Sequence, residues 1–192
     1  MRRKEKTHYL IVLDQSGSME RIKHTVISLF NEQIQSLKKQ SNEMNIEVTM
    51  SVFNDAISIL NLGAKIGDVQ LLNEKNYKPD SMTALYDAVM ISYNKMKEGV
   101  KKQDRMVALV LTDGLENASK EYNSDDVKKL MDKIERKGGS FNFLCSSVDI
   151  GSYQEALSVE SNDCISFDID EVEESLKAKL ERVSERILQY NH

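Results

Sequence analysis

The sequence predicts an α/β fold with a doubly wound, mostly parallel sheet of six strands and helices on both faces. One observation is that short apolar runs alternate with stretches whose apolar residues recur at helical spacing. The other is that the runs Tyr9–Leu13 and Arg105–Leu111 each lead into a polar turn with an aspartate, Asp14 and Asp113. Ligands of such Rossmann-like sheets bind outside the carboxyl ends of the strands. The two aspartates therefore predict both the fold and the edge of the sheet that carries the site.

Length and charge exclude several classes of protein. The chain has 192 residues, 40% of them hydrophobic, which fits one domain over residues 1–192. Its net charge of -5 argues against a nucleic-acid partner. The segment Met1–Lys6 is basic, but the apolar run after it is too short for the core of a signal peptide, and no apolar run has the length of a membrane span. We therefore expect a cytoplasmic protein with no membrane partner.

The two cysteines, Cys145 and Cys164, lie in apolar segments of strand length. In a cytoplasmic protein this placement favours buried thiols. A disulfide between them is the alternative.

The first part of the chain predicts a helix between two strands and then a hairpin. Apolar residues at helical spacing predict a helix over about Met19–Lys39. Alternating apolar and polar residues predict a half-buried strand over Ile46–Val52. The turn residues Asn54 and Asp55 lead from it into Ala56–Leu60, which makes the third strand antiparallel to the second.

A loop separates this hairpin from the next helix. The segment Asn61–Asp80 has no clean period and predicts a surface loop with one helical turn around Val69–Leu72. The helix that follows has Thr83 at its entrance. A threonine at such a position is an N-cap by default.

The second part of the chain continues the alternation. Ser124 is the expected N-cap of a helix that has Asp125 and Asp126 in its first turn and that Gly138 and Gly139 terminate. The remaining predicted elements are a strand over Phe141–Cys145 that extends towards Val148, a helix over Tyr153–Val159, an edge strand over Cys164–Phe167 and a final helix over Val172–Ile187.

The turn after the first strand carries three oxygen-bearing side chains at alternate positions, Asp14, Ser16 and Ser18. Gly17 lets the backbone turn tightly, so that all three can face one point. Hard oxygen ligands at the carboxyl end of a strand favour a divalent cation of the Mg2+ class. The alternative is an ordinary strand-to-helix turn in which Ser18 serves only as an N-cap. These residues alone leave both interpretations open.

Two later motifs complete a known pattern. They are Thr83 in Thr-Ala-Leu-Tyr-Asp-Ala and Asp113 in Leu-Thr-Asp-Gly. With Asp14-Gln-Ser16-Gly-Ser18 they stand in the order found in von Willebrand factor type A (vWA) domains, and the chain resembles such a domain from end to end. The resemblance implies a sheet in the order 3-2-1-4-5-6 with strand 3 antiparallel. It also implies that the five residues form a metal-ion-dependent adhesion site (MIDAS).

The resemblance implies a role for each of the five residues. Ser16 and Ser18 bind the cation directly, Thr83 binds it directly or through water, and Asp14 and Asp113 hold the water shell. The expected cation is Mg2+, with Mn2+ or Ca2+ as alternatives. One coordination position stays open for an Asp or Glu carboxylate of a protein partner.

The sequence departs from the family pattern at one place, where Ser81-Met82 replaces a glycine that is often found before the threonine. The stretch Asp113–Tyr122 is similar to stand-alone bacterial members of the family, which narrows the expected type. The identity of the partner, the pathway and the oligomeric state are left open by the sequence.

An enzyme is the main alternative, because a Mg2+ ion beside two aspartates could serve hydrolysis or phosphoryl transfer. Against it, the chain has neither the Asp-x-Asp arrangement of aspartate-nucleophile phosphatases after the first strand nor a Gly-x-x-x-x-Gly-Lys nucleotide loop. Glu116 could be a general base, but a solvated loop glutamate is the simpler interpretation. His8, His24 and His192 are not at zinc-site spacing, and we expect His8 at the start of a strand and His24 on the surface of a helix. A structural subunit with a vestigial site is a third possibility, and we expect a binding module rather than an enzyme.

Overall fold

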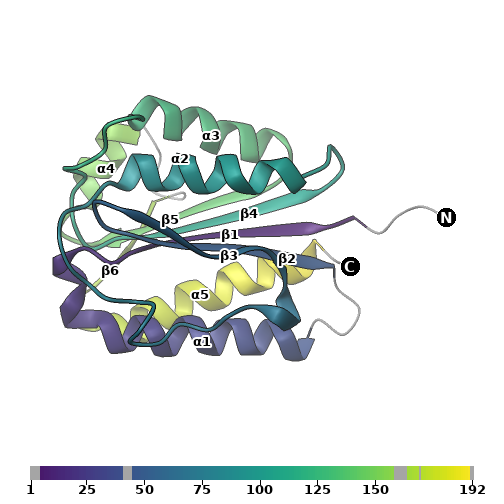
Figure 1. The fold of residues 1–192 in the computed structure, drawn as a ribbon, viewed down its shortest axis with the longest axis horizontal. Helices are drawn as coiled ribbons and strands as arrows, with labels where there is room; N and C mark the ends of the chain where they lie inside the picture. The colour runs from purple at the N-terminus through teal and green to yellow at the C-terminus, as the bar shows by residue number, and fades with distance from the viewer. Residues whose placement is uncertain (1–4, 41–44, 158–163, 169, 191–192) are drawn as a thin grey trace.

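A six-stranded sheet runs through the middle of the described part of the protein (Figure 1). The computed structural model describes residues 5–40, 45–157, 164–168 and 170–190. The strand order is β3-β2-β1-β4-β5-β6, with β3 antiparallel to β2 and the other neighbouring pairs parallel, which confirms the predicted topology. The strands are β1 (Thr7–Asp14), β2 (Ile46–Phe53), β3 (Ile57–Lys65), β4 (Arg105–Leu111), β5 (Ser140–Ser146) and β6 (Cys164–Phe167).

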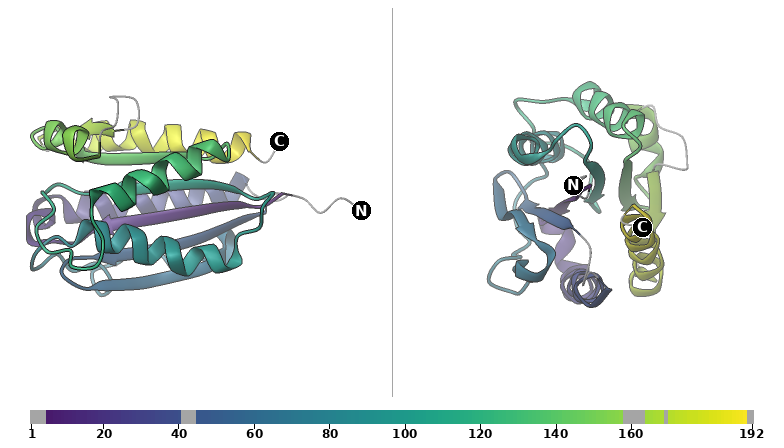
Figure 2. Two further views of the ribbon diagram at one scale, coloured as in Figure 1. Left: turned by 90° about the horizontal axis from the view of Figure 1, so that it is seen from above. Right: turned by 90° about the vertical axis from the view of Figure 1, so that its right-hand side faces the viewer.

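Helices cover both faces of the sheet (Figures 1 and 2). Along β1, Tyr9 and Ile11 pack in a core with α1 and α5, whereas Leu10 and Val12 pack in a second core with α2, α3 and α4. Successive side chains of a strand point to opposite faces, so one apolar run fills both cores. The helices are α1 (Lys23–Gln40), α2 (Leu85–Met96), α3 (Ser124–Arg136), α4 (Ile150–Leu157) and α5 (Val172–Gln189).

The third strand is longer than the sequence predicts. It runs through Lys65, and the short helical turn after it lies at Ile66–Asp68 rather than around Val69–Leu72. The pairing of β3 with β2 shifts register twice, and Gly63 has a φ of 58°. These irregularities break the alternation of apolar and polar residues, so the sequence pattern does not predict the second half of the strand.

Three predicted helix starts are wrong in detail. A 3-10 helix (Gly17–Ile22) precedes α1, and Ala84 rather than Thr83 holds the N-cap position of α2, with no capping hydrogen bond from its side chain. At α3 the cap is Asn123 instead of Ser124. The Asn123 side chain accepts hydrogen bonds from the backbone N–H groups of Asp125 and Asp126, and the Asp126 carboxylate accepts one in return.

Later elements keep their predicted positions with small shifts. Gly138, which has a φ of 73°, follows the end of α3, as predicted. Strand β5 ends at Ser146, and α4 begins at Ile150, three residues before its predicted start. The predicted end of that helix, residues 158–159, lies outside the described residues.

The structure describes the side chain of one of the two cysteines, Cys145, but not that of Cys164. Cys145 is buried in β5, as predicted. Cys164 begins β6, but its side chain lies outside the described part, so its predicted thiol state stays a prediction. Among the described helices, none has the length and apolar character needed to cross a membrane.

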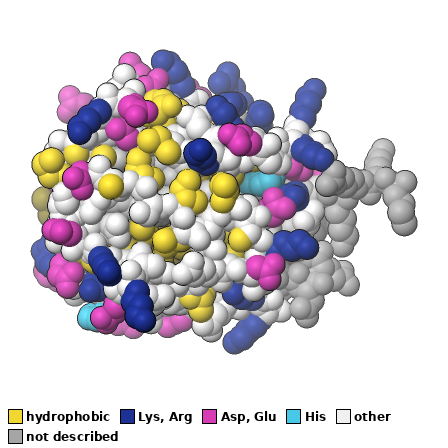
Figure 3. Space-filling model, in the orientation of Figure 1, with side chains coloured by type: hydrophobic (Ala, Val, Ile, Leu, Met, Phe, Trp, Pro, Cys, Tyr) yellow, Lys and Arg dark blue, Asp and Glu magenta, His cyan; other side chains and the backbone are white. Residues whose placement is uncertain are grey.

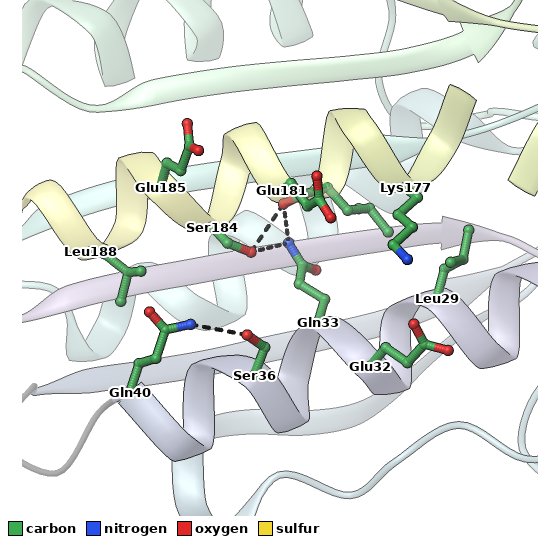
Figure 4. Close-up of a pocket in the computed structure, with 11 residues that line it drawn as sticks. Leu29, Glu32, Gln33, Ser36, Gln40, Lys177, Glu181, Ser184, Glu185 and Leu188 are labelled. Atoms are coloured by element: carbon green, nitrogen blue, oxygen red, sulfur yellow. Dashed lines mark hydrogen bonds between the residues drawn. The ribbon is translucent and has the colours of Figure 1, made fainter. Parts of the chain in front are cut away.

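A groove of about 490 Å³ lies between α1 and α5 (Figure 4). Gln33 lies buried beside it and donates to Leu180 O at 3.0 Å and to Ser184 Oγ at 3.1 Å. The Tyr9 hydroxyl donates to Gln33 Oε1 at 3.0 Å. This network joins β1, α1 and α5. None of the five predicted site residues lines the groove.

Candidate metal centre

The register of β1 and β4 brings the two aspartate turns together. Leu13 pairs with Leu111, so the next residues along the two strands, Asp14 and Thr112, lie side by side. The Thr112 hydroxyl donates to Asp14 Oδ2 at 2.6 Å. Asp113 follows directly, so both carboxylates lie at the same edge of the sheet, as the sequence predicts.

The loop after β1 brings its two serine hydroxyls together and turns that of Ser18 towards Asp113. The backbone N–H of Ser16 donates to Asp14 Oδ1 at 2.6 Å, which fixes the start of the loop. Ser16 Oγ and Ser18 Oγ lie 3.2 Å apart, and Ser18 Oγ donates to Asp113 Oδ1. The Ser18 side chain is therefore hydrogen-bonded to the second carboxylate, so it does not serve only as an N-cap.

Backbone pairing brings Thr83 to the same place. Its carbonyl accepts from the N–H groups of Asn117 and Ala118 at 3.0 and 3.2 Å, and its own N–H donates to Asn117 Oδ1 at 2.9 Å. A Cβ built on Gly114 would lie 3.3 Å from Ser18 Oγ and 3.8 Å from Thr83 Oγ1. The two hydroxyls thus face one small space, which a residue larger than glycine would narrow.

The donor set fits a hard divalent cation. Asp113 Oδ2 is buried and has no hydrogen-bond partner among the described residues. The Arg21 guanidinium is 3.9 Å away and its side chain is 60% exposed, so it compensates that oxygen only weakly. A buried carboxylate oxygen without a partner is costly, and a cation or its water would satisfy it. The described residues contain no cluster of three His, Cys, Asp or Glu side chains that could hold a metal, so the site depends on hydroxyls beside its two carboxylates.

Burial sets the electrostatics of the two aspartates. Burial raises the pKa of Asp14 from 3.8 to about 6. The hydrogen bonds from Thr112 and Ser16 lower this pKa, and the charge of Asp113 raises it. Burial also raises the pKa of Asp113, against the hydrogen bond from Ser18. Two carboxylates whose charged forms are disfavoured would be stabilised by a positive charge between them.

Three residues that the sequence analysis did not single out support the turns. The Thr112 hydroxyl orients Asp14, as described above. The Tyr77 hydroxyl donates to the Asp14 carbonyl at 2.5 Å, and the Tyr153 hydroxyl donates to the Gly114 carbonyl. The side chains of both tyrosines are buried. Thr112 lies within the Leu-Thr-Asp-Gly motif, but no motif marks the two tyrosines, because they reach the turns from a loop and from α4.

Glu116 lies in the loop after β4, where it is half-buried and both of its carboxylate oxygens accept hydrogen bonds. Its Oε1 accepts from the N–H groups of Ala118 and Ser119, and its Oε2 accepts from the Ser119 hydroxyl and from Tyr86 N–H. The carboxylate therefore joins the loop after β4 to the start of α2. Asp87, which is buried, supports the same loop by accepting from the N–H groups of residues 120–122.

His8, which the sequence predicts at a strand start, lies in β1 and far from this site in the sheet register. It is buried, and its Nε2 lies 3.1 Å from Asp104 Oδ2. His24 is exposed on α1, which agrees with the expected helix surface, and His192 lies outside the described residues.

Comparisons with known proteins bear on the fold. No protein-family model matches the sequence, and no curated protein matches it. Solved structures do match. The vWF domain of the type V pili tip protein Mfa5 from Porphyromonas gingivalis is 9% identical with a TM-score of 0.73, and the match covers 99% of this chain and 97% of that one. Proximal thread matrix protein 1 from the mussel byssus, in a structure with a zinc-occupied MIDAS motif, is 13% identical with a TM-score of 0.66.

A third match is the pilus adhesin SpaC from Lactobacillus rhamnosus GG, 12% identical with a TM-score of 0.70. The match covers 100% of this chain but 31% of SpaC, and for the byssus protein the shares are 97% and 46%. The chain thus spans less than half of these two proteins. At such low identity the matches show the fold alone.

Proposed function

We propose that this chain, which has the fold of a von Willebrand factor type A domain, is a metal-ion-dependent protein-binding module. A divalent cation held by the candidate metal centre bridges to an Asp or Glu carboxylate of a protein partner. The observation that carries the proposal is Asp113 Oδ2, a buried carboxylate oxygen without a hydrogen-bond partner among the described residues, beside the hydroxyl of Ser18.

The proposal gives each residue a distinct task. Ser16, Ser18 and Thr83 present neutral hydroxyls to the cation, and Asp14 and Asp113 hold the surrounding water. Because the inner ligands are neutral, a cation at this site stays electrophilic and favours an anionic group from outside. We propose Mg2+ as the cation, with Mn2+ or Ca2+ as alternatives. The zinc in the MIDAS motif of the byssus protein supports a divalent ion in general.

The arrangement favours binding over catalysis. The glutamate nearest to Asp113 in sequence has both carboxylate oxygens engaged with backbone and hydroxyl donors, so it is not free to take a proton from water. Two of the matched structures are named as an adhesin and a matrix protein. The cytoplasmic location and the bacterial type stay predictions from the sequence.

The test is a thermal and calorimetric titration of the full chain with Mg2+, Mn2+ and Ca2+. At about 100 times its dissociation constant a cation should stabilise the protein by roughly 2.7 kcal/mol. Ser16→Ala and Asp14→Ala should remove this effect. Ser152→Ala and Asp132→Asn change exposed residues on α4 and α3 and serve as matched controls that should keep it. If the wild-type chain binds none of the three ions, the proposal is wrong.

A further inference from the structure

A pocket of about 400 Å³ lies at the end of the sheet opposite the candidate metal centre. Its walls come from the ends of α2 and α3, the start of β4 and the segment before β4. Met106 lies near the beginning of β4, whereas Asp113 follows the end of that strand, so about 20 Å of extended chain separates the two places. In Figure 3, Lys and Arg side chains gather at the upper right, where Figure 1 shows the ends of α2 and α3. The pocket is therefore separate from the metal centre.

Apolar side chains form the floor of this pocket. Tyr93 of α2 and Ile134 of α3 are buried, and Val100 and Met106 are half-buried. Pockets of this size that combine an apolar lining with a few polar groups are typical of sites for small molecules. The floor therefore favours a ligand with an apolar body.

Three lysines surround the floor. They are Lys97, which directly follows α2, Lys133 in α3 and Lys137, which directly follows α3. Lys97 Nζ and Lys133 Nζ lie 5.9 and 5.2 Å from the centre of the Tyr93 ring, so ammonium groups from two different segments lie near one ring. Lys97 Nζ also donates to Asn94 Oδ1 at 2.7 Å, which is a neutral acceptor. Among the described residues, none of the three lysines forms an ion pair with a carboxylate.

The hydroxyl of Tyr93 is a further polar group at this pocket. Tyr93 is only 6% exposed, yet no described residue forms a hydrogen bond with its hydroxyl. A tyrosine hydroxyl in a buried side chain usually has a hydrogen-bond partner. Because Tyr93 lines the pocket, this hydroxyl is available to donate to an oxygen acceptor of a ligand there.

The two carboxylates of the pocket leave the lysines unpaired. Asp104 is buried, and its Oδ2 accepts from Lys101 N–H at 2.9 Å and lies 3.1 Å from His8 Nε2. Glu98 is exposed and forms no ion pair with a described residue. A negative group among the three ammonium groups would reduce their mutual repulsion.

These observations point to one chemical class of ligand. We propose that the pocket binds a small organic anion in which a carboxylate or phosphate group is attached to an apolar body. The anionic oxygens lie near the three lysines and accept from the Tyr93 hydroxyl, while the apolar body packs on the floor. This site is independent of the proposed metal-dependent function.

Two pairs of small anions test the proposal. Phenyl phosphate with inorganic phosphate, and phenylacetate with acetate, are titrated into the full chain by NMR at low ionic strength in EDTA. At least one aromatic anion should bind, about tenfold more tightly than its parent ion, because the ring buries apolar surface on the floor. The tighter of the two identifies the preferred anionic group. Benzylamine has the same ring with a positive charge and should bind at least tenfold more weakly.

Variants assign the binding to the pocket. The double variant Lys97→Gln with Lys133→Gln should lower the affinity for the tighter aromatic anion about tenfold. Tyr93→Phe keeps the ring and should lower it about threefold to tenfold. Lys95→Gln with Lys129→Gln removes two exposed lysines of α2 and α3 that do not line the pocket, and it should keep the affinity within about twofold. The amide NMR spectrum shows separately whether each variant is folded.

Several outcomes would overturn the pocket. They are no binding of either aromatic anion, equally tight binding of benzylamine, and an unchanged affinity in Tyr93→Phe. Equal losses in the two double lysine variants would show attraction by overall charge instead of binding in the pocket. Since every titration is done in EDTA, none of these results affects the proposed metal-dependent module.

Discussion

Asp14 is a buried carboxylate whose charge lowers the stability of the fold. Its side chain is fully buried, and burial raises its pKa to about 6. At neutral pH the carboxylate is charged in an environment that disfavours the charge. A folded-state pKa above the unfolded value of 3.8 means that protonation stabilises the fold. This contribution is fully present below about pH 4 and is lost as the pH rises through about 6.

Asp14→Asn should therefore raise the stability of the metal-free protein. Asparagine keeps an oxygen for Ser16 N–H and places its amide near Thr112 Oγ1, which has Gly114 O as another acceptor at 3.0 Å. The rise in the pKa of Asp14 from 3.8 to about 6 corresponds to a gain of up to about 3 kcal/mol at pH 7. Urea unfolding in EDTA measures the gain, which should shrink as the pH falls from 7 to 4. The variant should also lose the Mg2+ effect. A variant that is less stable than the wild type at pH 7 would show that the buried charge is not costly.

Ser81, whose φ is 67°, gives a second prediction at this scale. A left-handed conformation costs a residue with a side chain about 1–2 kcal/mol, and glycine avoids that cost but loses more chain entropy on folding. Ser81→Gly should raise the free energy of unfolding by about 0.5–1 kcal/mol. Ser81→Ala keeps the unfavourable φ and is the matched control, with little or no gain expected. Equal effects of the two substitutions would mean that the backbone at residue 81 carries no strain.

The order and type of the helices and strands can be predicted from the sequence, whereas the residues at which they begin and end cannot. The apolar runs of β1 and β4 and the spacing of α1 and α5 follow the periods of strand and helix, so their order and type are visible. The start of α3 is less certain, because Asn123 and Ser124 are both good caps and only the geometry selects Asn123. The second half of β3 lacks a regular alternation, so the sequence cannot distinguish it from a loop.

The contacts that place the predicted site residues are also invisible in the sequence. Parallel strands bring their carboxyl ends to one edge, so the meeting of Asp14 and Asp113 is predictable from pattern alone. The bonds from Thr112 and Tyr77 to Asp14 depend on how side chains and loops pack, for which the sequence has no periodic signal. The same is true of Asp87, which holds a loop 33 to 35 residues further along the chain.

Asp87 provides the prediction for this scale, because it attaches the loop after β4 to α2. Its carboxylate accepts three backbone N–H groups, and hydrogen bonds to charged groups are stronger than average. Asp87→Ala should lower the free energy of unfolding by about 2–3 kcal/mol and speed hydrogen exchange at residues 120–122. Asp132→Ala, on the exposed face of α3, is the matched control. Unchanged exchange at residues 120–122 in Asp87→Ala would contradict this role.

At the scale of the whole molecule, the candidate centre joins segments that are distant in sequence. From β1 the chain continues through α1 to β2 on one side, while β4 lies on the other side of β1. The strand order thus reverses between β1 and β4, and crevices of doubly wound sheets open at such a point. Residues 14–18, 83 and 113 meet there only when the sheet and its loops are complete. A cation that needs all three segments has no comparable site in the unfolded chain.

The stabilisation by Mg2+ should therefore follow simple linkage over the full range of concentration. Well above the dissociation constant, each tenfold increase in free Mg2+ should raise the free energy of unfolding by about 1.4 kcal/mol. The dependence on urea should keep the same slope, because the surface exposed on unfolding hardly changes. Urea unfolding at a series of Mg2+ concentrations, with Ser16→Ala as the control that should show no rise, measures both quantities. If the rise per tenfold increase in free Mg2+ falls well below about 1.4 kcal/mol, the unfolded chain also binds the ion. That result would contradict a centre assembled only by the fold.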